Sequence, residues 1–186
     1  MKENNYQTMR KNDADSQAWR INFIGEGSID AGGPYRESIT NMCDEMMSSF
    51  LPLFIPSQNN KNDHGQNRDC WTINPASTSP VHLEMYEFVG ALMGFAFRSG
   101  SILDIKLSQF FYRGLTGEPL DIADLRAVDA YAVQAIKDLD NAKKQLGKEL
   151  FNQTMTQTWV TRLSNGEEYE LIEDGANKTV DYDSVT

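Results

Sequence analysis

The longest apolar run in the chain, residues 88–97 (FVGALMGFAF), most strongly limits what the chain can fold into. A helix that crosses a bilayer needs about 18 or more apolar residues, and charged residues stand on both sides of this run. The run therefore predicts a buried helix over residues 80–99, with Gly100 as its stop signal. Gly90 and Gly94 form a GxxxG pattern, which predicts close packing against a second helix and no membrane partner.

Hydrophobic periodicity predicts further helices and a few short strands. Helices are expected over residues 35–50, 107–115 and 142–152 and behind two capping residues, Asp121 and Asp129. Strands are expected over residues 19–24, 70–73, 158–163 and 168–172, with Asn165-Gly166 as a hairpin turn. Residues 57–69 are almost wholly polar and predict a solvated surface loop. The expected fold class is α+β, mainly α, with a C-terminal β-hairpin.

Composition excludes several classes of function. The chain has 27 acidic and 17 basic residues and a formal charge of -10, which argues against a nucleic-acid partner because phosphate binding needs clustered Lys and Arg. Two cysteines without a CxxC pair, together with two histidines, offer no zinc-ligand spacing, so we expect neither a metal nor a cofactor. Sparse cysteines and an N-terminus without an apolar segment favour the cytoplasm.

A glycine-rich stretch, GEGSIDAGGPYRES over residues 25–38, first suggests a phosphate-binding loop. It lacks the Lys and Ser or Thr of a P-loop, and Asp30 stands where a dinucleotide fingerprint needs its third glycine. A structural turn fits better. Gly32 and Gly33 would let the backbone pass where a Cβ would clash, Pro34 suits the first helical turn, and Asp30 can accept backbone N–H bonds there.

The same stretch resembles the opening of the conserved part of HECT ubiquitin ligase domains, in FIGEGSIDAGGPYRE at residues 23–37. Further similar motifs follow in order: NPAS at 74–77, FVGALMGFA at 88–96, ILD at 102–104, FYRGL at 111–115, DL at 124–125, VD at 128–129, EL at 170–171 and DG at 174–175. RDC at 68–70 and WR at 19–20 look most like the large HERC-type members. The resemblance covers roughly residues 16–186.

The resemblance implies part of a ligase in which ubiquitin passes as a thioester from a conjugating enzyme to a cysteine and then to a substrate lysine. It implies a polar segment at 1–15, the large subdomain of the N-terminal lobe at 16–123, and the start of a small enzyme-docking subdomain at 124–186. The C-terminal lobe with its Thr-Cys motif is expected beyond residue 186. No catalytic residue is therefore assigned in this chain; Cys43 lies on an apolar helical stripe, and Cys70 has no partner constellation.

The resemblance also implies a docking surface for a ubiquitin-conjugating enzyme. Ala132, Ala135, Ile136 and Leu139 recur at the spacing of one helix face and are similar to the groove-lining helix of the family, while Met155 matches a further groove position. The stripe could equally be the core of the small subdomain. The resemblance places the second groove wall beyond residue 186, so we expect a shallow groove and weak binding.

The implied partners are a ubiquitin-conjugating enzyme, ubiquitin, and a protein substrate bound through regions outside this chain. Two other interpretations stay open: a non-catalytic interaction module that retains the HECT scaffold, and a fragment with no independent role. A downstream reading frame that ends near a Thr-Cys motif would favour the ligase, whereas a stop codon would favour the other two.

Overall fold

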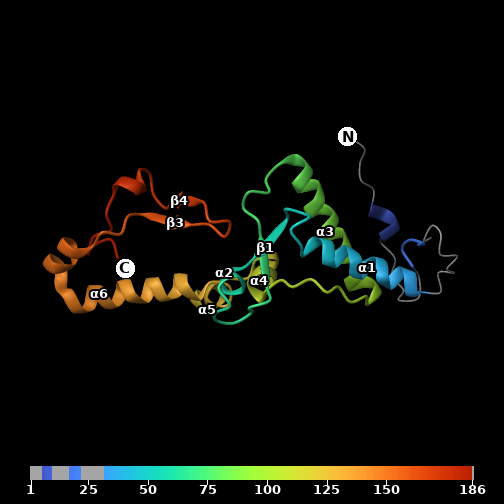
Figure 1. The fold of residues 1–186 in the computed structure, drawn as a ribbon, viewed down its shortest axis with the longest axis horizontal. Coiled ribbons are helices and arrows are strands. Elements are labelled where there is room, and N and C mark those ends of the chain that lie inside the picture. Colours follow the sequence, from blue (N-terminus) through green and yellow to red (C-terminus); the bar gives the residue numbers. More distant parts are fainter. Residues whose placement is uncertain (1–5, 10–16, 22–31, 186) are drawn as a thin grey trace. The chain divides into compact units, whose positions relative to one another are not determined.

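A computed structural model of the chain describes residues 6–9, 17–21 and 32–185. The chain divides into two compact units, each made of two segments: unit 1 is Met1–Phe54 with Ala76–Lys106, and unit 2 is Ile55–Pro75 with Leu107–Thr186. The predicted class, α+β and mainly α, is confirmed (Figure 1). The subdomain boundary predicted at residue 124 stays a prediction.

Unit 1 is built on two long helices, α1 (Gly33–Met46) and α3 (Pro80–Ser99), with a short 3-10 turn, η1 (Tyr6–Met9). The Trp19 ring lies 5.0 Å from Tyr35 of α1 and 5.7 Å from Phe95 of α3, measured between ring centroids. The Trp19 indole N–H also donates to Ser38 Oγ at 3.0 Å. The strand predicted at 19–24 does not appear at residues 19–21, and its remainder lies outside the described residues.

The start of α1 explains one of the glycines. Gly32 caps the helix with φ +100°, a left-handed conformation that favours glycine, and Pro34 occupies the first turn as predicted. Among the described residues, no atom lies within 4 Å of a Cβ built on Gly32 or Gly33, so the predicted clash is not seen there. Asp30, predicted to accept bonds at this turn, lies outside the described residues.

Helix α3 has the predicted bounds but not the predicted burial. Ser79 caps it and Gly100 ends it in a left-handed conformation. However, Phe97 is 92% exposed, and among the described residues no atom lies within 4 Å of a Cβ built on Gly90. The close helix packing expected at the GxxxG pattern is therefore wrong for this part of the chain: α3 buries a different face, through Val89, Leu92 and Phe95. No helix in the described residues is long and apolar enough to cross a membrane.

Unit 2 contains the remaining helices and strands, including the longest helix, although Phe54 at the start of the first strand belongs to unit 1. They are the two-stranded sheet of β1 (Phe54–Pro56) and β2 (Trp71–Ile73), the helices α2 (Gln58–Lys61), α4 (Gln109–Thr116), α5 (Ile122–Arg126) and α6 (Ala130–Thr154), the hairpin strands β3 (Val160–Arg162) and β4 (Glu168–Glu170), and the 3-10 turn η2 (Gly175–Asn177). The residues at 57–69 are not merely a solvated loop, because they include α2 with Asn59 fully buried.

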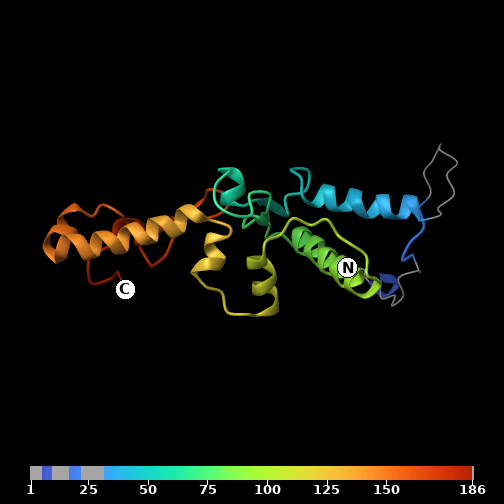
Figure 2. The same ribbon diagram turned by 90° about the horizontal axis from the view of Figure 1, so that it is seen from below.

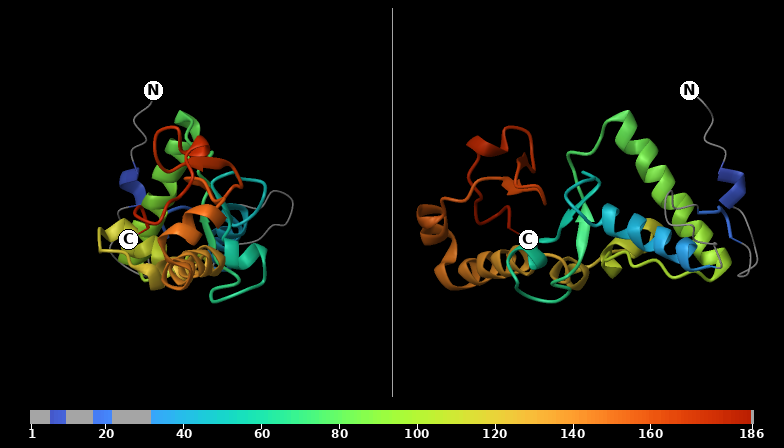
Figure 3. Two further views of the ribbon diagram at one scale, coloured as in Figure 1. Left: turned by 90° about the vertical axis from the view of Figure 1, so that its left-hand side faces the viewer. Right: turned by 45° about the vertical axis from the view of Figure 1, so that its right-hand side comes forward.

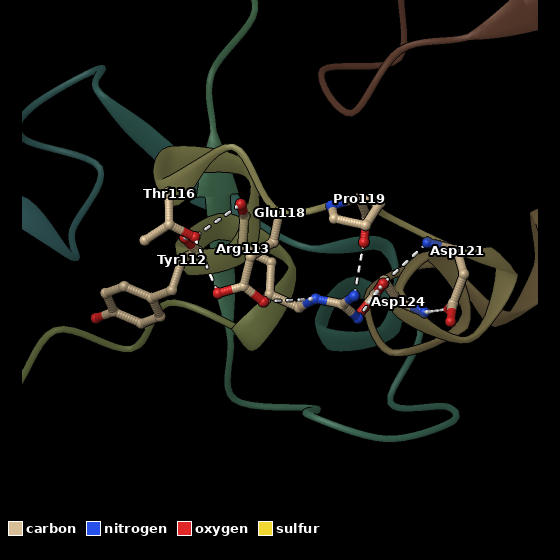
Figure 4. A network of polar contacts seen from close by, with 7 residues as sticks. All are labelled: Tyr112, Arg113, Thr116, Glu118, Pro119, Asp121 and Asp124. Carbon is tan, nitrogen blue, oxygen red and sulfur yellow. Dashed lines mark hydrogen bonds and ion pairs between the residues drawn. The ribbon is translucent and has the colours of Figure 1, made fainter.

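Helices α4 and α5 lie side by side and are joined by a short loop (Figure 2). Asp121 caps α5 as predicted, accepting N–H bonds from Ala123 at 2.7 Å and Asp124 at 3.0 Å. Asp124 also accepts from Arg113 of α4 (Figure 4). These bonds hold α5 in place. The next helix, α6, begins four residues after α5 ends.

Helix α6 is two helical pieces joined at Gly147, where φ is 68° and ψ is 169°. Its axis turns near its C-terminal end, and the hairpin and C-terminal residues run alongside it (Figure 1; Figure 3, right). Strands β3 and β4 pair antiparallel, with Thr161 opposite Tyr169, which confirms the predicted hairpin around Asn165-Gly166. Phe151, after the break, is completely buried.

Candidate protein-docking site

One face of α6 is open to solvent, and the N-terminal cap fixes where this helix begins. Asp129 accepts the N–H of Ala132 at 2.9 Å and so fixes the start of the helix. From that start, Val133 turns inward and is 1% exposed, whereas Ile136 is 52% exposed. Ile136 is therefore not part of the core of unit 2, to which α6 contributes Val133 and Phe151, while Ala132 and Leu139 are half-buried.

The open face of α6 forms one wall of a groove of about 670 Å³ within unit 2. Four of the five predicted residues line it: Ala132, Ala135, Ile136 and Leu139. The opposite wall comes from β3 and the C-terminal residues, with Trp159, Val160, Leu163, Leu171, Val180 and Val185. Phe110, Leu125 and Val128 add further apolar surface. The arrangement suits insertion of apolar side chains from another protein.

The position of Met155 differs from that of the other four predicted residues. It caps the C-terminal end of α6, with its N–H donating to Phe151 O at 2.9 Å, and it is not among the groove-lining residues. A second wall of this groove comes from β3 and residues 180–185, and the wall expected beyond residue 186 stays a prediction. The alternating pattern of residues 158–163 predicted the strand, but it carried no signal that the strand would face α6. Whether the four lining residues contact a partner stays a prediction.

Backbone bonds hold the second wall together. Trp159 N–H donates to Gly175 O at 3.0 Å, Leu171 N–H donates to Trp159 O at 2.9 Å, and Val180 N–H donates to Gln157 O at 2.8 Å. A Cβ built on Gly175 would lie 2.5 Å from Trp159 O, so only glycine fits there. This close approach fixes Trp159 beside the groove.

The C-terminal residues contact α6 on both sides of its break. Before the break, Lys143 lies 4.9 Å from the centroid of the Tyr182 ring and donates to Val185 O. After the break, the Phe151 ring packs edge-on against Tyr182, with 5.8 Å between centroids. Lys148 forms an ion pair with Asp183 at 2.5 Å, and this hydrogen bond raises the pKa of Lys148. The wall at residues 180–185 is thereby attached to α6.

Two of the three charged residues that line the groove form ion pairs, and the third, Asp129, caps α6. Asp140 forms an ion pair with Lys144 at 2.5 Å, and Arg162 forms one with Glu168 at 3.5 Å. Among the described residues, no three His, Cys, Asp or Glu side chains gather as metal ligands would. The groove therefore offers apolar surface edged by two ion pairs and the capping carboxylate of Asp129, which suits binding of a protein segment.

The two cysteines lie outside the groove lining, and both are unpaired and buried. Burial raises the pKa of the Cys43 thiol; a backbone hydrogen bond at Asp104 opposes this, and the charges of Asp104 and Asp44 add to it. Burial likewise raises the pKa of the Cys70 thiol, with a contribution from Asp69. A raised pKa lowers the fraction of thiolate, which is the form that attacks a thioester.

Comparisons with known proteins agree on one family. The model of the HECT-domain (ubiquitin-transferase) family matches residues 40–186. The E3 ubiquitin-protein ligase HERC2 of Mus musculus is 42% identical over 113 residues, which is 61% of this chain and 2% of that protein. The E3 ubiquitin-protein ligase TOM1 of Saccharomyces cerevisiae is 29% identical over 133 residues, 71% of this chain and 4% of that protein. The E3 ubiquitin-protein ligase ptr1 of Schizosaccharomyces pombe is 25% identical over 192 residues, 95% of this chain and 6% of that protein. The chain thus spans only a small fraction of the length of these relatives.

Proposed function

Because this chain belongs to the HECT-domain family of ubiquitin transferases, we propose that it is part of a HECT-type ubiquitin-protein ligase and that its groove docks a ubiquitin-conjugating enzyme. Docking would bring the thioester-bound ubiquitin carried by that enzyme close to the cysteine that accepts it. Ubiquitin and a substrate lysine would then complete the reaction, with the substrate held by regions outside this chain.

The single observation that carries this proposal is the exposed apolar face of α6. Ile136 is 52% exposed and lines a groove with two apolar walls, although leaving such a side chain in water has a cost that burial would remove. A protruding apolar side chain from a partner loop would fit between Ile136 and the β3 wall.

The acyl exchange itself is assigned to a cysteine outside this chain. Both cysteines of the chain are buried and have raised pKa values, so neither offers the accessible thiolate that the exchange needs. The same burial also suits the second candidate, a non-catalytic module that uses the groove for binding alone. We propose a cytoplasmic location, which the two unpaired cysteines support.

The test measures binding of the full chain to a panel of ubiquitin-conjugating enzymes by calorimetry. Ile136→Asp and Leu139→Asp place a charge in the groove and should weaken binding at least about tenfold. Leu146→Asp is the matched control, since Leu146 lies on the same helix, is 36% exposed and does not line the groove. Normal binding by the two groove variants would refute the docking assignment, and a panel in which the unaltered chain binds nothing would refute the proposed function.

A further inference from the structure

The single-turn helix α2 contains a fully buried asparagine whose polar groups are all used. Asn59 Nδ2 donates to Arg126 O at 2.9 Å and to Gln66 O at 3.0 Å, and Asn59 Oδ1 accepts the N–H of Ala130 at 2.7 Å. The backbone N–H of Asn59 donates to Val128 O at 3.0 Å. Ala130 is the first residue of α6, so Asn59 fixes the end of α5 and the start of the helix that forms one groove wall.

The residues on either side of Asn59 reach the other wall. Gln58 Nε2 donates to Ser164 O at 3.3 Å, and Lys61 Nζ donates to the same oxygen at 2.5 Å. Ser164 follows β3, and both Gln58 and Ser164 line the groove. Residues 58–61 therefore bind both walls. Asn59 bonds to the α6 wall, and Gln58 and Lys61 bond to the β3 wall.

Helix α2 is itself anchored. Ser57 caps it by accepting the N–H of Asn60 at 3.2 Å and is 1% exposed. The backbone N–H of Ser57 donates to Cys70 O at 3.0 Å, which ties α2 to the chain entering β2. A Cβ built on Gly65 would lie 2.9 Å from Asn59 Nδ2, so the loop after α2 also closes tightly around this side chain.

We propose that α2 is a positioning element that sets the spacing between the two walls of the groove, with Gln58, Asn59 and Lys61 as positioning residues. Its role in docking rests on the proposed function. Because Lys61 is exposed, the bonds to Ser164 O can be removed without disturbing the core. Asn59 is fully buried, so its substitution would disturb folding. Loss of the bonds to Ser164 should loosen the β3 wall while α6 keeps its cap.

The test uses Gln58→Ala combined with Lys61→Ala in the full chain. Hydrogen exchange of amides over residues 160–170 should quicken about tenfold, since two hydrogen bonds that hold this segment are lost. Exchange over residues 130–146 should stay unchanged, and the Tm should fall by no more than about 3–6 °C. Lys178→Ala is the control: it removes one lysine bond of the same kind, from Nζ to Glu173 O at 2.6 Å, at a residue outside the groove lining.

Binding of a conjugating enzyme distinguishes a positioning role of α2 from a contribution to stability alone. At a temperature at which the chain is fully folded, the double variant should bind the conjugating enzyme at least about threefold more weakly, and Lys178→Ala should bind normally. Unchanged exchange over residues 160–170, or the same acceleration in the control, would overturn the role of α2. If the unaltered chain binds no conjugating enzyme, the proposed function fails, and the exchange comparison alone decides whether α2 positions the wall.

Discussion

Arg113 of α4 holds Asp124 of α5 through one nitrogen: Nη1 lies 2.8 Å from Oδ1 and 2.6 Å from Oδ2 (Figure 4). Asp124 is 8% exposed and also accepts the N–H of Asp121 at 2.9 Å. The guanidinium uses a further N–H on Pro119 O at 2.6 Å. One arginine therefore ties α4, the loop after it and the capping box of α5 into a single network just before α6.

Arg113→Ala should lower the Tm by about 5–10 °C, because it leaves the carboxylate of Asp124 buried without its counter-charge. Differential scanning calorimetry measures the change. Arg68→Ala is the control: Arg68 pairs with Asp63 at 3.2 Å, but the two side chains are 59% and 86% exposed, so its loss should shift the Tm by less than about 1 °C. Equal shifts in the two variants would refute the importance of the network.

The cap at Asp121 should make stability depend on acid pH. The N–H bonds that Asp121 accepts from Asp124 and Ala123, and then the nearby charge of Arg113, lower its pKa below the ordinary value of 3.8. A lowered pKa in the folded state gives stability that is present above pH 3.8 and is lost as the pH falls through the folded value. Asp121→Asn keeps an acceptor without the charge, so the loss of Tm between pH 7 and pH 3 should shrink by about 2–4 °C. An unchanged loss would contradict this origin.

The sequence predicted those elements whose signals are local. Helix α3 begins at Pro80 and ends at Gly100 as predicted, and Asp121 and Asp129 cap the helices they were expected to cap. Hydrogen-bonding residues with distant partners carried no such signal. In the sequence, Asn59 is one of many polar residues in a polar segment. Its partners Arg126 and Ala130, which bury it, lie far along the chain.

The candidate site was predicted for one wall only, for the same reason. The spacing of Ala132, Ala135, Ile136 and Leu139 defines a helix face from the sequence alone. That Trp159 lies across from it depends on hairpin packing and on the close approach of Gly175 to Trp159 O, which are tertiary features. Phe97 was expected to be buried because its run is apolar, but it projects from the exposed face of α3.

The break in α6 should make Gly147 intolerant of substitution. Its φ of 68° and ψ of 169° are essentially open to glycine alone, so Gly147→Ala should lower the free energy of unfolding by about 1–3 kcal/mol. Gly114→Ala is the opposite case, because Gly114 lies within α4 and no atom of the described part of the chain lies within 4 Å of a Cβ built there. This variant should stabilise the chain by about 0.5–1 kcal/mol. Denaturant unfolding of both variants checks the signs, and stabilisation by Gly147→Ala would contradict the break.

The two cysteines should be unreactive in the folded chain. Burial raises the pKa of both thiols, so little thiolate forms at pH 8 and reagents cannot reach it. Reaction with a coloured disulfide reagent should be about 100-fold slower than for free cysteine, and both thiols should react at once in 6 M guanidinium. Incubation with a ubiquitin-loaded conjugating enzyme should give no reducible adduct on this chain. Rapid native labelling of Cys70, or such an adduct, would place acyl chemistry here after all.

Photo-crosslinking at two exposed apolar positions of α6 tests the docking account most directly. A photoreactive residue replaces Ile136, which is 52% exposed in the groove, or Leu150, which is 46% exposed and does not line it. With a ubiquitin-conjugating enzyme present, capture at position 136 and little at position 150 is the predicted result. Equal capture at both positions, or capture at position 150 alone, would contradict the assignment of the groove as the docking site.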